Sequence, residues 1–141
     1  MKSLEIPAEK ARLSEALDFV LDFAEKLGFE KKELFQLKLC TEEIFVNVAS
    51  YAYGSDTGLI TVTAQGSTDP LSVTLSFIDS GAPFDPLTKP DPAKDRPLSQ
   101  AKKGGLGIFI TKSFMDEVSY AYQDGKNILT IRKTRPVNGQ G

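Results

Sequence analysis

LITVTAQGSTDPLSVTLSFIDSG, residues 59–81, contains two runs in which apolar and polar side chains alternate. The apolar members are Ile60, Val62 and Ala64 in the first run and Leu71, Val73, Leu75 and Phe77 in the second. A period of two is typical of strands that bury one face. The turn-forming residues between the runs, Ser67 to Pro70, predict a β-hairpin.

Two helices are predicted on the N-terminal side of this hairpin. Pro7 is expected to open an amphipathic helix that ends at Gly28, with its apolar residues at helical spacing. A second helix is expected from about Lys31 to Tyr53. Its apolar side would carry Leu34, Leu37, Thr41, Ile44, Val48 and Tyr51. Residues 2–6 could form a short strand.

The C-terminal side of the hairpin begins with a segment that has no apolar period, residues 80–103. Five of the eight prolines lie in it, and a stretch this long predicts a functional loop or lid. A third helix is expected from Gly104 to about Met115. Residues 118–122 and 127–133 predict a closing hairpin around Asp124 and Gly125, and the chain from Arg135 onward is expected to be frayed.

These elements predict one α+β domain, residues 1–135, followed by a disordered tail, residues 136–141. The net charge of −2 gives no bulk positive field for nucleic acid or an anionic membrane. Histidine is absent and Cys40 is the only cysteine, which excludes Ser-His-Asp and Cys-His catalysis, histidine metal sites and disulfides. Without a long apolar run or a signal-peptide pattern, the expected location is cytoplasmic.

Glu43 and Asn47 form the first candidate site. Their i,i+4 spacing places a carboxylate and an amide on one side of the second helix. An amide oxygen suits Mg²⁺, and a carboxylate one turn away can accept a proton from an attacking hydroxyl. The alternative is that both are solvated residues on an exposed helix edge.

Asp79 and Gly81 form the second candidate site. Asp79 continues the side of its strand that holds Leu75 and Phe77, so its carboxylate is expected to point toward the apolar layer. A carboxylate there needs a donor, which the exocyclic amine of adenine could supply, and Gly81 would let a ring approach the backbone. A simple turn at the strand end is the alternative.

The glycine-rich run Lys103-Gly104-Gly105-Leu106-Gly107 is the third candidate site. Glycines that lead into a helix expose backbone N–H groups at its positive end, where phosphates bind, and the two lysines before them, Lys102 and Lys103, add charge. A flexible loop end is the alternative.

Taken in order, these segments resemble the three boxes of the Bergerat (GHKL) ATP-binding fold. TEEIFVN, residues 41–47, is similar to the N box; DSGAPFD, residues 79–85, to the G1 box; and GGLGI, residues 104–108, to the G2 box. With FMDEV at residues 114–118, the chain resembles the small bacterial anti-sigma-factor serine-protein kinases in particular. The resemblance implies a two-layer α+β sandwich, with a mixed, mostly antiparallel sheet, about three helices and a long ATP lid.

The resemblance also implies a role for each candidate residue. Asn47 would ligand Mg²⁺, and Glu43 would be the general base. Asp79 would accept from the adenine amine above Gly81, while the 104–107 backbone would hold phosphates under a lid of residues 85–103. Lys103 stands where the family often has arginine.

Two positions depart from the family pattern. Tyr51 stands where a histidine often follows the N box. Lys126 and Asn127 follow Gly125, where a threonine is common.

The function implied is that of an ATP-dependent serine-protein kinase and anti-sigma factor in a partner-switching circuit. It would phosphorylate a serine of a STAS-type anti-anti-sigma partner, bind a sigma factor and form a homodimer, without direct contact with nucleic acid or membrane. One alternative is a non-catalytic ATP-binding module that acts by sequestering its partner. Another is the catalytic domain of a histidine-kinase-like system.

Overall fold

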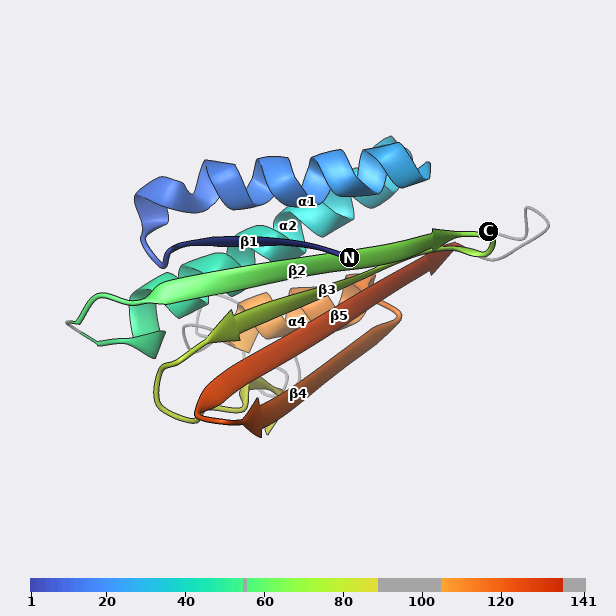
Figure 1. The fold of residues 1–141 in the computed structure, drawn as a ribbon. Helices are drawn as coiled ribbons and strands as arrows, with labels where there is room; N and C mark the ends of the chain where they lie inside the picture. The colour runs from blue at the N-terminus through green and yellow to red at the C-terminus, as the bar shows by residue number, and fades with distance from the viewer. Residues whose placement is uncertain (55, 89–104, 136–141) are drawn as a thin grey trace.

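A five-stranded antiparallel sheet forms one layer of the molecule (Figure 1). The computed structural model describes residues 1–54, 56–88 and 105–135. The strands are β1 (Lys2–Pro7), β2 (Leu59–Thr68), β3 (Leu71–Asp79), β4 (Glu117–Gln123) and β5 (Lys126–Arg135). Their order is β1-β2-β3-β5-β4. All four pairings are antiparallel, which agrees with the expected mostly antiparallel sheet. The two predicted hairpins are confirmed, and β3 lies at the centre of the sheet.

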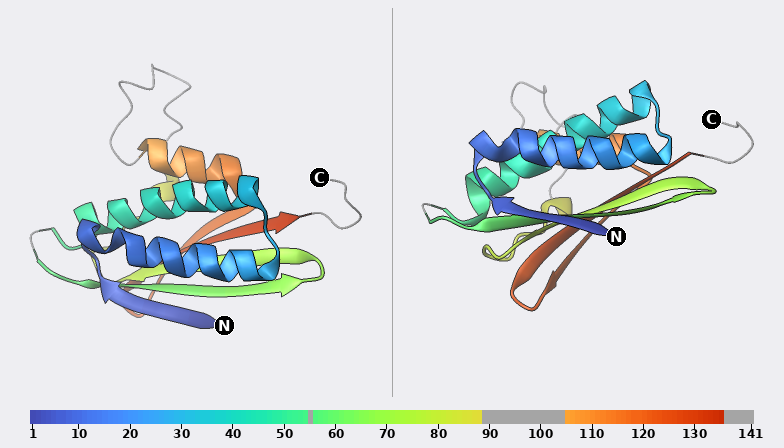
Figure 2. Two further views of the ribbon diagram at one scale, coloured as in Figure 1. Left: turned by 90° about the horizontal axis from the view of Figure 1, so that it is seen from above. Right: turned by 45° about the horizontal axis from the view of Figure 1, so that its top comes forward.

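Three α-helices of the described residues form the second layer on one face of the sheet. They are α1 (Leu13–Leu27), α2 (Lys31–Asn47) and α4 (Gly105–Phe114). Figure 2 shows them side by side, with α2 in the middle. The two-layer α+β sandwich is therefore confirmed, and every buried strand residue faces this helix layer.

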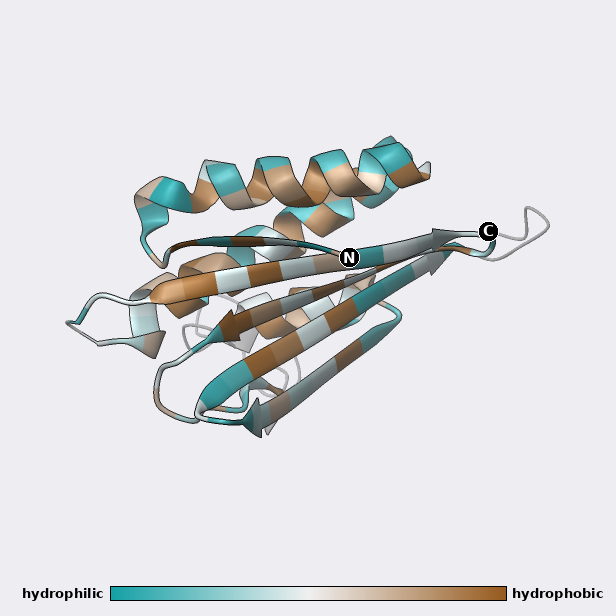
Figure 3. Cartoon of the chain, in the orientation of Figure 1, coloured by the Kyte–Doolittle hydropathy of each residue, from teal (hydrophilic) through white to brown (hydrophobic). Residues whose placement is uncertain are grey.

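The core fills the space between the layers and follows the predicted alternation. Val73, Leu75 and Phe77 of β3 are buried, and they pack with Leu37 and Phe45 of α2 in one cluster. Figure 3 shows the corresponding alternating bands of hydropathy along β2 and β5. Burial of each large apolar side chain contributes about 1.5–3 kcal/mol, so this core fixes the position of β3 under α2.

The first helix begins later than predicted. Pro7 does not open it, because Pro7 is the last residue of β1 and pairs with Leu59 of β2. A short 3-10 turn, Lys10–Arg12, then leads into α1 at Leu13. Proline lacks a backbone donor, but β1 is an edge strand, where this loss costs little.

The second helix has the predicted extent but ends in an unusual turn. Helix α2 begins with a capping box between Glu30 and Glu33 and ends at Asn47. Residues Val48–Ala52 continue as a π-helix. This wider turn changes the direction of the side chains that follow, and Tyr51, predicted on the apolar side, is 50 % exposed.

The remaining elements agree with prediction except at their ends. Within the predicted lid, Pro86–Thr88 form a 3-10 turn, and residues 89–103 lie outside the described residues. Helix α4 is confirmed. The predicted turn is also confirmed, and its two residues, Asp124 and Gly125, have positive φ. Arg135 is not frayed, because it pairs with Leu71 in the sheet. The predicted tail, residues 136–141, also lies outside the described part.

Candidate functional site

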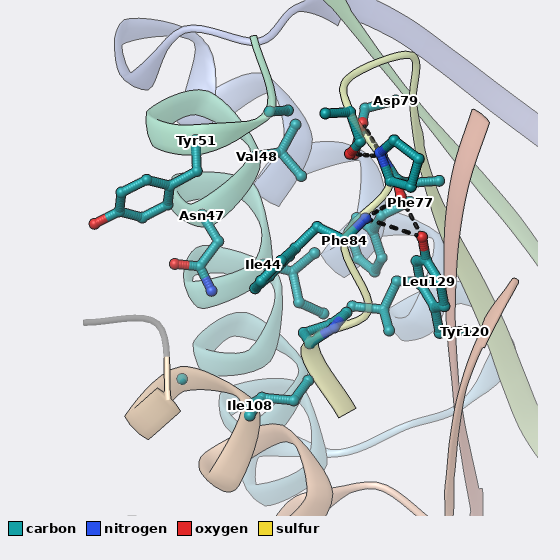
Figure 4. Close-up of a pocket in the computed structure, with 16 residues that line it drawn as sticks. Ile44, Asn47, Val48, Tyr51, Phe77, Asp79, Phe84, Ile108, Tyr120 and Leu129 are labelled. Atoms are coloured by element: carbon teal, nitrogen blue, oxygen red, sulfur yellow. Dashed lines mark hydrogen bonds between the residues drawn. The ribbon is translucent and has the colours of Figure 1, made fainter. Parts of the chain in front are cut away.

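A cavity of about 480 Å³ lies between α2, the end of β3, the first turn of α4 and the closing hairpin. Apolar side chains such as Ile44, Phe77 and Leu129 form most of its wall, and Asn47, Asp79 and Asn127 are among its polar groups (Figure 4). Its size and lining are those of a small-molecule site with a few orienting polar groups.

Asp79 lies at the inner end of this cavity, as predicted. It is the last residue of β3 and only 7 % exposed. Its Oδ1 accepts hydrogen bonds from the backbone N–H of Gly81 and from Nδ2 of Asn127, both at 2.9 Å. In the described part of the chain no group donates to Oδ2, so this atom remains as an acceptor for a ligand donor.

Asn127 holds Asp79 from the neighbouring strand. The two residues are paired in the β3–β5 register, and both are buried. The Asn127 Nδ2 also donates to the carbonyl oxygens of Gly81, at 3.3 Å, and Ala82, at 3.0 Å. Its Oδ1 accepts from the backbone N–H of Phe84 at 3.0 Å and from the Tyr120 hydroxyl. One amide therefore joins β3, β4, β5 and the 81–84 loop.

Sequence reasoning assigned no site role to Asn127 or Tyr120. The signal available for Asn127 was its strand position, since it lies on the same side of β5 as the buried Leu129 and Ile131. A polar residue that starts an inward-facing series needs a partner. The partner of Asn127 is Asp79, and this pairing depends on the register between β3 and β5, which cannot be predicted from the sequence alone.

Gly81 fits where a larger residue would not. It is buried, and an added Cβ would collide with the carbonyl oxygen of Ala52 at the end of the π-helix. The 81–84 loop therefore lies directly against the end of the α2 segment. Tyr53 fixes the same junction, because its hydroxyl accepts from the backbone N–H of Ser80 at 2.8 Å.

Glu43 and Asn47 lie toward the other end of the cavity, beside α4. Asn47 lines the cavity. Glu43 contacts the first turn of α4, where a Cβ added to Gly107 would stand 2.8 Å from Glu43 Oε2. The structure thus brings together the first predicted pair and the end of the glycine run, at the positive end of a helix dipole.

The rest of the glycine run is described only in part. Gly105 and Leu106 begin α4, which confirms that the glycines lead into a helix. Lys103 and Gly104 lie outside the described residues. The positions of Asn47 and Gly107 therefore mark this end of the site.

Two further observations limit the chemistry of the described residues. Burial raises the pKa of the Cys40 thiol to about 11, so this core cysteine is not a nucleophile at neutral pH. Within the described ranges, no three His, Cys, Asp or Glu side chains form a cluster that could hold a metal.

No helix among residues 1–54, 56–88 and 105–135 is long and apolar enough to span a membrane.

Comparisons with known proteins agree with this geometry. A model of the histidine kinase-like ATPase domain family matches residues 6–133. The serine/threonine-protein kinase BtrW of Bordetella bronchiseptica is 29 % identical over 131 residues, covering 92 % of this chain and 90 % of the relative. The serine-protein kinase RsbW of Listeria monocytogenes is 28 % identical over 135 residues, covering 92 % of this chain and 85 % of the relative.

Among solved structures, the chain is similar in fold to the RsbU and RsbW domains of Rv1364c from Mycobacterium tuberculosis. The TM-score is 0.63 at 18 % sequence identity. The match covers 96 % of this chain and 34 % of that one, so this chain spans about a third of the solved protein.

Proposed function

The chain belongs to the histidine kinase-like ATPase domain family, and on this premise we propose that it is an ATP-dependent serine-protein kinase that acts as an anti-sigma factor. The observation that carries the proposal is the arrangement of the cavity. A buried carboxylate with one free oxygen lies at one end. The Asn47 amide and the first turn of α4 line the other end, and the Glu43 carboxylate lies next to that turn without lining the cavity itself. Adenine and a triphosphate have chemistry that matches these two ends.

At the inner end, the adenine amine would donate to Asp79 Oδ2. The Oδ1 atom already has two donors, so the carboxylate cannot turn without losing them. The space at the missing side chain of Gly81 is taken by the carbonyl oxygen of Ala52 rather than by the cavity. Apolar contact with the ring would come from Ile44, Phe77 and Leu129, which line the cavity. A ligand N–H that meets a carboxylate in a buried site makes a strong, charge-assisted hydrogen bond.

At the outer end, backbone N–H groups of residues 104–107 would hold the phosphates, and Lys103 would add positive charge near the terminal one. The donor set fits Mg²⁺, since Asn47 offers one neutral oxygen beside the cavity and this ion takes its other ligands from phosphates and water. When bound, Mg²⁺ offsets the negative charge that develops in phosphoryl transfer.

Glu43 would act as the general base. Its carboxylate lies beside the first turn of α4, next to the expected position of the phosphates. It would accept the proton of a serine hydroxyl as that oxygen forms a bond to the γ-phosphorus. The bond from the γ-phosphorus to the bridging oxygen then breaks, and ADP leaves with the electron pair.

The partner that we propose is a STAS-type anti-anti-sigma protein, which would receive the phosphoryl group on a serine. A sigma factor would be the second partner, and the kinase would act as a homodimer in the cytoplasm. The family resemblance of the three boxes and the names of the kinase relatives support this circuit.

Glu43→Gln tests the proposal most directly. The variant keeps the shape of the side chain but cannot accept a proton, so transfer to a STAS-domain protein should fall by about 10²–10⁴-fold. Binding of ATP, measured by calorimetry with Mg²⁺, should stay within about threefold of wild type.

Other outcomes would support the competing functions. Tight ATP binding by the wild type without any transfer to such partners would indicate a non-catalytic regulatory module. A phosphorylated product that is labile in acid, as phosphohistidine is, would indicate a histidine-kinase-like system instead.

A further inference from the structure

The Asn127 amide uses all of its hydrogen-bonding capacity within the protein. A primary amide has two N–H donors and two oxygen lone pairs. The donors serve Asp79 Oδ1 and the carbonyl oxygens of Gly81 and Ala82, and the oxygen serves Phe84 N–H and the Tyr120 hydroxyl. Asn127 lines the cavity but has no spare group for a ligand.

We propose that Asn127 is a positioning residue that gives the site its preference for 6-amino over 6-oxo purine nucleotides. Asn127 acts through Asp79. Its Nδ2 donates to Oδ1 of Asp79, so Oδ2 of Asp79 is the one carboxylate oxygen that faces the base. This inference rests on the proposed function, because it assumes that the cavity binds a purine nucleotide.

The orientation of the amide is set by its neighbours. Phe84 N–H can only donate, and it does so to Asn127 Oδ1 at 3.0 Å and to the Tyr120 hydroxyl at 3.2 Å. The Tyr120 hydroxyl therefore directs its own proton to Asn127 Oδ1. A flipped amide would place its oxygen against the Asp79 carboxylate and two carbonyl oxygens. Such acceptor–acceptor contacts in a buried site are strongly unfavourable.

The backbone gives this arrangement little freedom. Asp79 and Asn127 are directly opposite each other in the central β3–β5 pairing, and each is 7 % exposed. Rotation of Asp79 would leave Asn127 Nδ2 and Gly81 N–H without their shared acceptor, each at the cost of a buried unsatisfied donor.

The fixed Oδ2 atom discriminates between purines. An adenine-type base offers an N–H donor at position 6, whereas a hypoxanthine or guanine base offers a carbonyl oxygen there. Two acceptors facing each other in a buried site repel, so the 6-oxo base is rejected. Without Asn127, Oδ1 loses a donor, and the carboxylate can turn to let water mediate contact with either base.

The test compares ATP with inosine triphosphate, which differs at position 6 of the purine by carrying oxygen in place of nitrogen. Dissociation constants for both are measured by calorimetry on the full chain. Asn127→Val keeps a strand-favouring residue but removes the amide. We expect ATP affinity to fall about 10–100-fold and inosine triphosphate affinity to change less than threefold.

Tyr120→Phe is the milder variant, because it removes one of the two donors to Asn127 Oδ1. We expect the ATP preference to fall about threefold. Thr130→Val is the matched control. It deletes a hydrogen bond between the same two strands, Ser76 to Thr130 at 2.9 Å, on the opposite face of the sheet. It should leave both affinities unchanged.

The ratio of the two affinities separates positioning from folding, because a partly unfolded variant loses both nucleotides equally. An unchanged ratio in Asn127→Val and Tyr120→Phe, in a wild type that prefers ATP, would overturn this inference alone. A folded wild type that binds neither nucleotide at millimolar concentration would overturn the proposed function, and this inference with it.

Discussion

The two ends of the cavity differ in how much of their geometry the protein itself determines. At the inner end, Asp79 is held by Gly81 and Asn127, and Asn127 by Tyr120 and Phe84. At the outer end, no hydrogen bond from the described residues holds the side chain of Glu43 or Asn47, although both lie where the phosphates are expected.

This difference follows from the charge of the expected ligand parts. A neutral base contributes little electrostatic energy, so its recognition depends on a polar group that is fixed in advance. A triphosphate with a metal brings its own charges and can order nearby side chains as it binds. We therefore expect mutations at the inner end to act on nucleotide selection and those at the outer end to act on metal dependence and transfer.

Asp79→Asn should have the largest effect on nucleotide binding. The asparagine oxygen can still accept from Gly81 and Asn127, so the melting temperature should change by only a few degrees. Its NH₂ group, however, replaces Oδ2 and repels the adenine amine. ATP affinity should fall at least about 100-fold by calorimetry.

This variant tests the comparison because it changes one atom of a fixed network. If the fold is unchanged and ATP still binds within threefold of wild type, the inner end does not contact the base. The contrast between the two ends would then be wrong.

Asn47→Ala should have an intermediate effect that depends on Mg²⁺. The variant removes the one amide oxygen offered to the ion, and it leaves the inner network intact. ATP affinity in Mg²⁺ should fall about 10-fold, while affinity in EDTA should be unchanged. Equal losses in both buffers would assign Asn47 to nucleotide contact rather than to the metal.

Arg135→Met should have the smallest effect, and none on nucleotide binding. Arg135 forms an ion pair with Glu33 at the start of α2, far along β5 from Asn127. Its hydrogen bond to the Glu33 carboxylate is the main cause that lowers the pKa of Glu33 below its usual 4.5. When the pKa of a carboxyl is lower in the folded state, its ionised form stabilises the fold fully at pH values above the usual pKa of 4.5. This contribution to stability is lost as the pH falls through the lower pKa of the folded state.

Thermal melting from pH 7 to pH 3 checks this prediction. The variant should melt a few degrees below wild type at pH 7, and the two should converge below about pH 4.5. A gap that is constant with pH would show that Arg135 contributes through packing rather than through its charge. A change in the ATP affinity of Arg135→Met would show that nucleotide binding also depends on residues outside the two ends of the cavity.

The sequence predicted the elements whose periodicity is long and regular. The alternation of Val73, Leu75 and Phe77 placed β3 and the direction of Asp79, and the glycine run located the start of α4. Pro7 was misassigned because proline serves both at a helix start and on an edge strand, and only the pairing with Leu59 decides between them. The π-turn at Val48–Ala52 likewise has no local sequence signature.

The residues of the candidate site also divide into those that a local motif reveals and those that depend on the pairing of distant strands. Glu43, Asn47, Asp79 and Gly81 belong to short local motifs, so the sequence alone could name them as candidates, and of these four Asn47 and Asp79 line the cavity. Asn127 and Tyr120 gain their chemistry from strands that meet only in three dimensions. A single sequence does not contain the register between distant strands, and this register joins Asn127 to Asp79.

The pairing of Asp79 with Asn127 also has a consequence for the order in which the protein can be assembled. The two residues are 48 positions apart, and Asn127 belongs to β5, the last of the described strands. During synthesis, Glu43, Asn47 and Asp79 all emerge before the residue that sets the carboxylate. The proposed contact with the base can therefore add to the stability of the fold only when β5 has entered the sheet.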